Sequence, residues 1–104
     1  MRVTVVSIPD CPNREVADAR VRRALAVVRL ADVELAHRVI STHELAVAER
    51  FHGSPTIQFD GVDPFASVGA PIGFACRIYP TYQGLAGVPT VTQLVEAIRS
   101  HLAR

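Results

Sequence analysis

The stretch that decides the fold is VTVVSIPDCP, residues 3–12, close to the start of the 104-residue chain. Residues 3–8 are mostly apolar and β-branched, and turn residues follow at once, which predicts a central strand buried on both faces. A helix is predicted from about Asn13 to Leu30, because Ala17, Val21, Ala24 and Val28 recur at helical spacing. The chain therefore passes from a buried strand to a long helix at Cys11.

The remaining elements follow from alternation and from punctuating residues. We expect a strand over Val33–Ile40 and a short helix that opens with a capping box at Ser41–Glu44 and stops at Gly53. A third strand is expected over Pro55–Phe59 and a fourth over Phe74–Tyr79. A second capping box, Thr90 with Gln93, opens a helix that runs to the C-terminus.

The predicted element order is β-α-β-α-β-β-α, in one domain spanning residues 1–104. Two strands separated by a long helix favour a parallel pair with a right-handed crossover, and the last two strands are close enough to pair antiparallel. The sequence therefore predicts an α/β fold, with a four-stranded mixed sheet and helices on both faces.

Composition excludes several classes of function. A net charge of +1 gives no strong field for nucleic acid or an anionic membrane surface. No stretch approaches the roughly 20 apolar residues of a membrane span. No secretory apolar segment is seen, so the cytoplasm is the expected location. All 11 basic residues are Arg, which is typical of a GC-rich bacterial genome. The four histidines show no metal-ligand spacing, and no cofactor motif is present.

Two short motifs carry a family resemblance. The turn Pro9-Asp10-Cys11-Pro12 after its strand, and Gly53-Ser54-Pro55-Thr56 before the third strand, resemble the active turn and the cis-proline loop of the thioredoxin superfamily. This resemblance implies a thioredoxin-like fold, thiol–disulfide oxidoreductase chemistry and a cis peptide bond before Pro55. It also implies a Ser54 backbone free to pair with an extended substrate near Cys11.

The position of Cys11 has a physical rationale. We expect Cys11 at the N-cap of the first helix and Pro12 at N1, with the amides of Asn13 and Arg14 directed at the sulfur. Partial positive charge at a helix start favours the thiolate, which is the reactive form. The Arg14 guanidinium can add a full charge. The expected catalytic residues are Cys11 and Arg14, and the expected substrate-binding residues are Pro12, Asn13, Ser54 and Pro55.

The chain departs from the thioredoxin pattern at one position. Thioredoxins carry Cys-x-x-Cys, and Arg14 stands where the second cysteine would be. Three routes stay open: a monothiol mechanism with an external thiol, a remote resolving cysteine, or no catalysis. Cys76 is the one remote candidate, although the face it shares with Phe74 and Ile78 favours a buried core cysteine.

The leading hypothesis is a redox protein whose partner is a thiol or disulfide, either a protein or a low-molecular-weight compound. A second hypothesis is a non-catalytic binding module with an apolar rim formed by Phe65, Tyr79, Tyr82 and Leu85. A third is the handling of soft metals or organomercurials by Cys11 and Cys76. It rests on a resemblance to small bacterial thioredoxin-like proteins grouped with alkylmercury lyases, which share the cysteine-proline turn and the stretches GSPT, GVDPFA and ACRIY.

Overall fold

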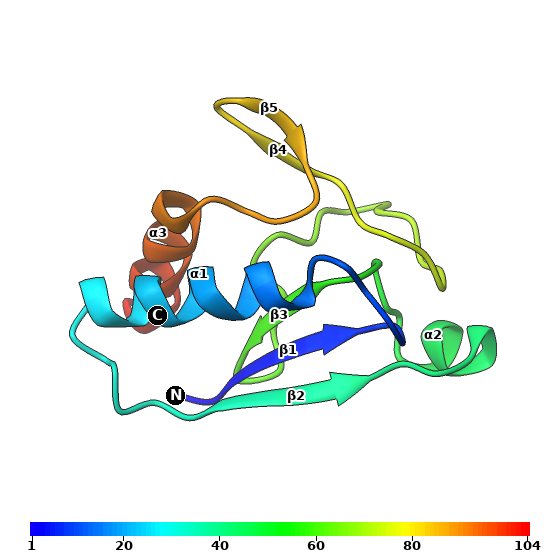
Figure 1. Ribbon diagram of the computed structural model, residues 1–104, viewed down its shortest axis with the longest axis horizontal. Coiled ribbons are helices and arrows are strands. Elements are labelled where there is room, and N and C mark those ends of the chain that lie inside the picture. Colours follow the sequence, from blue (N-terminus) through cyan, green and yellow to red (C-terminus); the bar gives the residue numbers. More distant parts are fainter.

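A computed structural model describes residues 1–104, and Figure 1 shows its element order. The helices are α1 (Arg14–Val27), α2 (His43–Ala48) and α3 (Val91–Leu102). The strands are β1 (Val3–Ser7), β2 (Leu35–Val39), β3 (Thr56–Phe59), β4 (Tyr79–Thr81) and β5 (Gly84–Ala86). No helix has the length and apolar character needed to cross a membrane.

The main sheet has three strands in the order β2-β1-β3. β1 pairs with β2 in parallel, from Val3 opposite Leu35 to Ser7 opposite Val39. It pairs with β3 in antiparallel, with Val6 opposite Thr56. The prediction of β1 as the central strand is therefore confirmed. The C-terminal end of β1 and the start of β3 lie at the same end of the sheet, and this end carries both sequence motifs.

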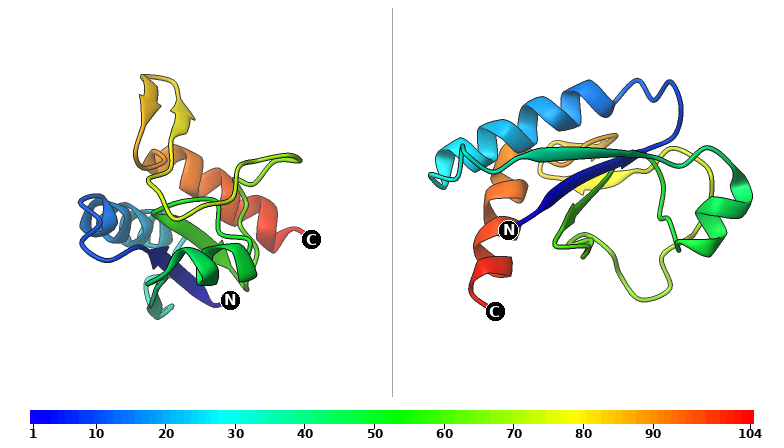
Figure 2. Two further views of the ribbon diagram at one scale, coloured as in Figure 1. Left: turned by 90° about the vertical axis from the view of Figure 1, so that its right-hand side faces the viewer. Right: turned by 90° about the horizontal axis from the view of Figure 1, so that it is seen from below.

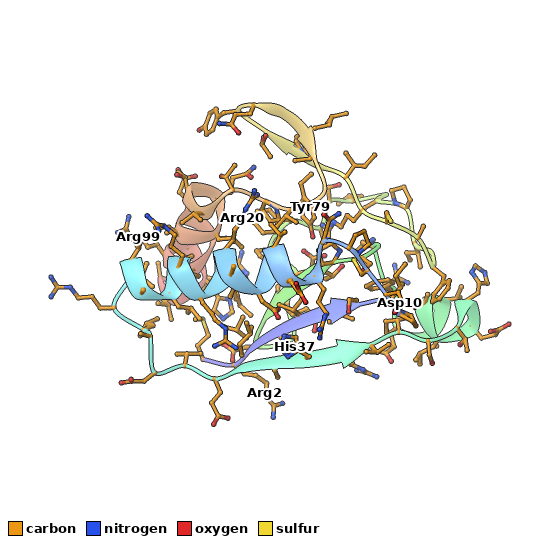
Figure 3. The ribbon with its side chains drawn as sticks, viewed as in Figure 1. Arg2, Asp10, Arg20, His37, Tyr79 and Arg99 are labelled. Atoms are coloured by element: carbon orange, nitrogen blue, oxygen red, sulfur yellow. The ribbon has the colours of Figure 1, made fainter.

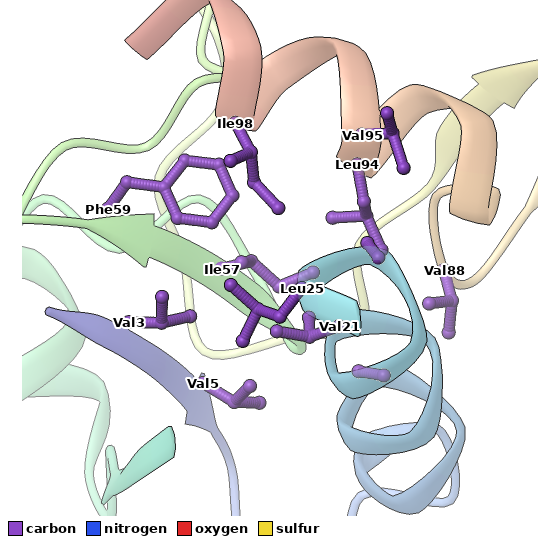
Figure 4. Packing of buried hydrophobic residues seen from close by; sticks show 12 residues of the cluster. Val3, Val5, Val21, Leu25, Ile57, Phe59, Val88, Leu94, Val95 and Ile98 are labelled. Atoms are coloured by element: carbon purple, nitrogen blue, oxygen red, sulfur yellow. The ribbon is translucent and has the colours of Figure 1, made fainter. Parts of the chain in front are cut away.

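One face of this sheet supports the main core. Alternate residues of β1 and β3 point to the same side, where α1 and α3 cover them (Figures 2 and 4). The apolar spacing predicted for the first helix is confirmed, since Ala17, Val21 and Ala24 are fully buried. The buried members of this core are Val3, Val5, Ala17, Val21, Ala24, Leu25, Ile57, Phe59, Val88, Leu94, Val95 and Ile98.

The opposite face is covered at one end only. Ala46 of α2 packs with Val6, Ile40 and Phe51 in a small second core. The rest of that face is a polar depression of about 690 Å³, lined by Arg2, Thr4, Ala36, His37, Arg38, Gln58, Asp60 and Gly61.

The prediction of a four-stranded thioredoxin-like sheet is wrong. The expected fourth strand, Phe74–Tyr79, contributes one isolated bridge between Ser54 and Cys76, and the chain then forms β4 and β5 as a separate hairpin. The reason is the side chains that face inward. Arg77 and Tyr79 are buried, whereas Phe74 is 38% and Ile78 66% exposed. The alternation was read correctly, but its two faces are exchanged.

Several element boundaries also differ from the prediction. α1 begins at Arg14, with Asn13 as its N-cap, and ends at Val27. The N-cap of α2 is Thr42, whose hydroxyl accepts from the Leu45 N–H, so Ser41 and Glu44 do not form the predicted capping box. α2 ends through Arg50 with a φ of 55°, not at Gly53. The Thr90–Gln93 capping box of α3 is confirmed.

Gly53 is required where the chain enters the cis-proline segment. Its φ is 111°, and an added Cβ would lie 3.0 Å from the Arg77 Cβ and 3.2 Å from the Arg77 N. Gly61 also has a positive φ of 81°, but a Cβ there meets no atom within 4 Å. Gly73 has neither constraint.

These three glycines make a matched series. We expect Gly73→Ala to be nearly neutral and Gly61→Ala to cost about 1–2 kcal/mol, the usual penalty for a left-handed residue with a Cβ. Gly53→Ala should cost more than Gly61→Ala, because backbone crowding is added to the same penalty. Urea denaturation gives the order directly. Equal losses for Gly53→Ala and Gly61→Ala would show that Arg77 does not press on Gly53.

Candidate functional site

Cys11 lies in the connection between β1 and α1. It precedes the N-cap Asn13 by two residues, so the prediction that Cys11 is itself the N-cap is wrong. The Arg14 N–H donates to the Cys11 carbonyl at 3.3 Å instead of being directed at the sulfur. Asp10, with a φ of 57°, turns the chain just before the cysteine. The thiol is free and half-buried.

The Cys11 turn borders an open cleft of about 490 Å³. The cleft lies at the end of β1 and β2 where α1 begins, near the label of Asp10 in Figure 3. One guanidinium, of Arg14, and two carboxylates, of Asp10 and Glu15, give it charge. Its lining residues are Ser7, Ile8, Pro9, Asp10, Cys11, Pro12, Arg14, Glu15 and Val39. A small polar molecule therefore has access to the surroundings of the thiol.

Asn13 has a positioning role and does not line the cleft. It packs against Gly87, where an added Cβ would lie 2.3 Å from the Asn13 Nδ2. About two helical turns further on, Arg20 donates to the Val88 and Pro89 carbonyls at 3.4 and 3.1 Å. These contacts hold the start of α1 against the segment that leads from β5 to α3.

Ser54 is fully buried, and the Ser54–Pro55 peptide bond is cis, the isomer expected from the sequence. The Ser54 N–H donates to the Ala75 carbonyl at 2.8 Å, and the Arg77 N–H donates to the Ser54 carbonyl at 2.9 Å. The Ser54 hydroxyl accepts from the Ile8 N–H at 3.0 Å. The expectation of a Ser54 backbone free for an extended substrate is therefore wrong. Residues 75–77 occupy both backbone groups of Ser54, and we call these residues the strap.

The side chain of Arg77 anchors the strap through buried contacts. Its guanidinium donates to Asp63 at 2.5 Å and to the Thr56 hydroxyl at 3.2 Å, and it lies 4.6 Å from the centre of the Tyr79 ring. The Tyr79 hydroxyl, labelled in Figure 3, donates to the Pro55 carbonyl. Burial raises the pKa of this phenol well above its usual value, so Tyr79 stays a neutral donor.

Cys76 is exposed, so its interpretation as a core residue is wrong. The structure brings Cys11, Pro12 and Arg14 to one cleft, whereas Ser54, Pro55 and Cys76 belong to the strap and its partner. The two groups are joined by the hydrogen bond from the Ile8 N–H to the Ser54 hydroxyl, since Ile8 also lines the cleft.

Sequence reasoning missed the anchoring residues Asp63, Arg77 and Tyr79. Asp63 and Arg77 stand in a stretch from 62 to 89 that contains no other charged residue. Two opposite charges isolated in an uncharged stretch are a recognisable sign of a buried pair.

Three of the four histidines contact polar groups elsewhere in the structure. His37 contacts Asp18 and His101 contacts Asp60, each at 2.7 Å, and the His52 Nδ1 lies 2.9 Å from the Pro71 carbonyl. No group of three or more His, Cys, Asp or Glu side chains is arranged to hold a metal ion.

The predicted apolar rim divides into two parts. Phe65 packs edge-on against Tyr79, with ring centres 5.5 Å apart, and is partly buried against the main core. Tyr82 and Leu85, on the projecting β4–β5 hairpin, are 88% and 75% exposed (Figure 2).

No family model, no curated protein and no solved structure matches this chain.

The Ser54 hydroxyl gives a direct test of how the two groups are joined. Ser54→Ala removes the acceptor of the part-buried Ile8 N–H, and leaving this donor without a partner should cost about 1 kcal/mol. We expect that loss in urea denaturation, together with faster hydrogen exchange at the Ile8 amide. The exposed Ser67 supplies the control, since Ser67→Ala should change neither. An Ile8 amide equally protected in Ser54→Ala would contradict the assignment.

Proposed function

We propose that this protein is a thiol-based redox protein in which Cys11 exchanges with low-molecular-weight disulfides. The observation that carries the proposal is the half-buried free thiol on the lining of an open cleft, which it shares with Arg14, the first residue of α1. The motif resemblance to the thioredoxin superfamily supports the same chemistry at the same residue.

The class of substrate follows from the strap. Both backbone groups of Ser54 are bonded to the chain's own residues 75–77, so an extended protein substrate has no edge to pair with there. The cleft that Cys11 lines is open and has a volume of about 490 Å³. A disulfide of a few dozen atoms can enter it, as can the thiol that later regenerates Cys11. Such thiols are abundant in the cytoplasm, where we place the protein.

The reaction balances in two exchange steps. The Cys11 thiolate attacks one sulfur of the small disulfide, the old sulfur–sulfur bond breaks, and one thiolate leaves as the mixed disulfide forms. A second small thiol, or a second cysteine of the chain, then attacks the Cys11 sulfur and releases the other half. Arg14 is the one cationic residue on the lining of the cleft, and a positive charge near the exchanging sulfurs stabilises the thiolates that attack and leave.

The reactivity of Cys11 is measured by the rate of alkylation with iodoacetamide at pH 7. In Cys76→Ser, we expect Cys11 to react faster than a model thiol. In Arg14→Gln, we expect Cys11 to react several-fold more slowly than it does in the unsubstituted protein. Arg22→Gln is the matched control, because Arg22 is exposed on α1 and does not line the cleft. A Cys11 that alkylates no faster than the model thiol would refute the proposal.

A non-catalytic binding module remains the second candidate, and the exposed Tyr82 and Leu85 favour it. An apolar hairpin tip of this kind is typical of a contact surface. The two candidates differ in which variants lose function. Binding would survive Cys11→Ser and fail in Tyr82→Ser with Leu85→Ser, whereas redox activity with a small disulfide shows the reverse pattern.

A further inference from the structure

No structural role explains the presence of a cysteine at the exposed position 76. Its side chain takes part in no hydrogen bond, and it lies outside both apolar cores. Its backbone nevertheless occupies one of the most constrained places in the chain. The flanking residues Ala75 and Arg77 are bonded to the two sides of Ser54, and the Arg77 side chain is anchored to Asp63. A reactive group is thus held in a fixed position and left accessible.

The pairing also defines the side of the strap on which this thiol lies. Residues directly paired in a β-bridge place their side chains on the same side, and Cys76 pairs with Ser54. The Ser54 side chain is directed toward the Ile8 N–H. Arg77, next along the strap, points to the opposite side, where it meets Asp63 and Thr56. Cys76 therefore lies on the Ile8 side of the strap.

Ile8 begins the connection that carries Cys11 three residues later. Pro9, Asp10 and Pro12 in this connection are exposed, and the positive φ of Asp10 turns it. The connection therefore has room to adjust, whereas the strap is held by buried contacts. The Cα atoms of two cysteines joined by a disulfide lie within roughly 7 Å of each other. Formation of a Cys11–Cys76 disulfide therefore requires the Cys11 turn to approach the strap.

We infer that Cys76 is the resolving cysteine of Cys11. The inference rests on the proposed function and supplies its second step. After Cys11 has formed a mixed disulfide, the Cys76 thiolate attacks the Cys11 sulfur, and the bond to the small thiol breaks. That thiol leaves with the electron pair as a thiolate, and a Cys11–Cys76 disulfide remains. The small disulfide is reduced to two thiols, and the two protein thiols are oxidised.

The test uses 5,5′-dithiobis(2-nitrobenzoic acid), an aromatic disulfide, at one equivalent per protein molecule. Released thionitrobenzoate is followed by absorbance, and the products are weighed by mass spectrometry under non-reducing conditions. With the parent protein we expect two equivalents of released anion and a product that has lost two hydrogens and carries no adduct. Cys76→Ser should release one equivalent and retain one adduct at Cys11.

A displaced cysteine controls for the mere presence of a second thiol. The double variant Cys76→Ser/Ala75→Cys keeps two cysteines, but residue 75 points to the opposite side of the strap from residue 76. It should retain the adduct at Cys11, or close at least tenfold more slowly than the parent. Circular dichroism of each variant confirms that the fold is kept.

The outcomes separate the two claims. A parent protein that keeps an adduct on Cys11 just as Cys76→Ser does would overturn the resolving role and leave the proposed function standing. Closure at parental rate in the double variant would overturn the positional argument, and with it the inference. A Cys11 that forms no adduct in Cys76→Ser would refute the proposed function itself.

Discussion

The structure depends on the bonding of one buried residue, Ser54. Its amide, its carbonyl and its hydroxyl are all engaged, with Ala75, Arg77 and Ile8 respectively. These three bonds join the end of β1, the start of β3 and the strap, which are far apart in the sequence. A buried polar group that lost its partner here would cost about 1–3 kcal/mol. Ser54 therefore places Ile8, the first residue of the connection that carries Cys11.

The anchoring of the strap explains why the chain departs from a simple layered sheet. Arg77 and Tyr79 take the inward positions, and each finds a polar partner, Asp63 and the Pro55 carbonyl. A buried charge without a partner is strongly unfavourable, so the pair fixes which face of the strap turns inward. The same choice leaves Cys76 outside. A more apolar residue at position 77 would have removed the reason for this orientation.

The sequence predicted the parts of the fold that depend on apolar periodicity and on local capping. β1, α1, α3 and the Thr90–Gln93 capping box follow from patterns a few residues long, and the structure has them. The prediction of the fourth strand was wrong because alternation alone does not say which of the two faces of a strand is buried. That choice was made by the pairing of Asp63 with Arg77, 14 residues apart, and the alternation within residues 74–79 carries no information about such a pair.

The candidate site also has a part that the sequence predicted and a part that it did not. The turn around Cys11 could be located from the strand–helix junction, and Arg14 does line its cleft. The occupied edge of Ser54 could not be foreseen, because it depends on a segment more than 20 residues away. This edge changes the account most, since it shifts the expected substrate from an extended peptide to a small disulfide. The most direct measurement is a crystal structure of Cys76→Ser after reaction with a small disulfide. We expect an adduct on Cys11 that lies in the cleft beside Arg14 and Val39, with Ser54 still bonded to residues 75 and 77. An adduct seated on the Ser54 edge with the strap displaced would contradict it.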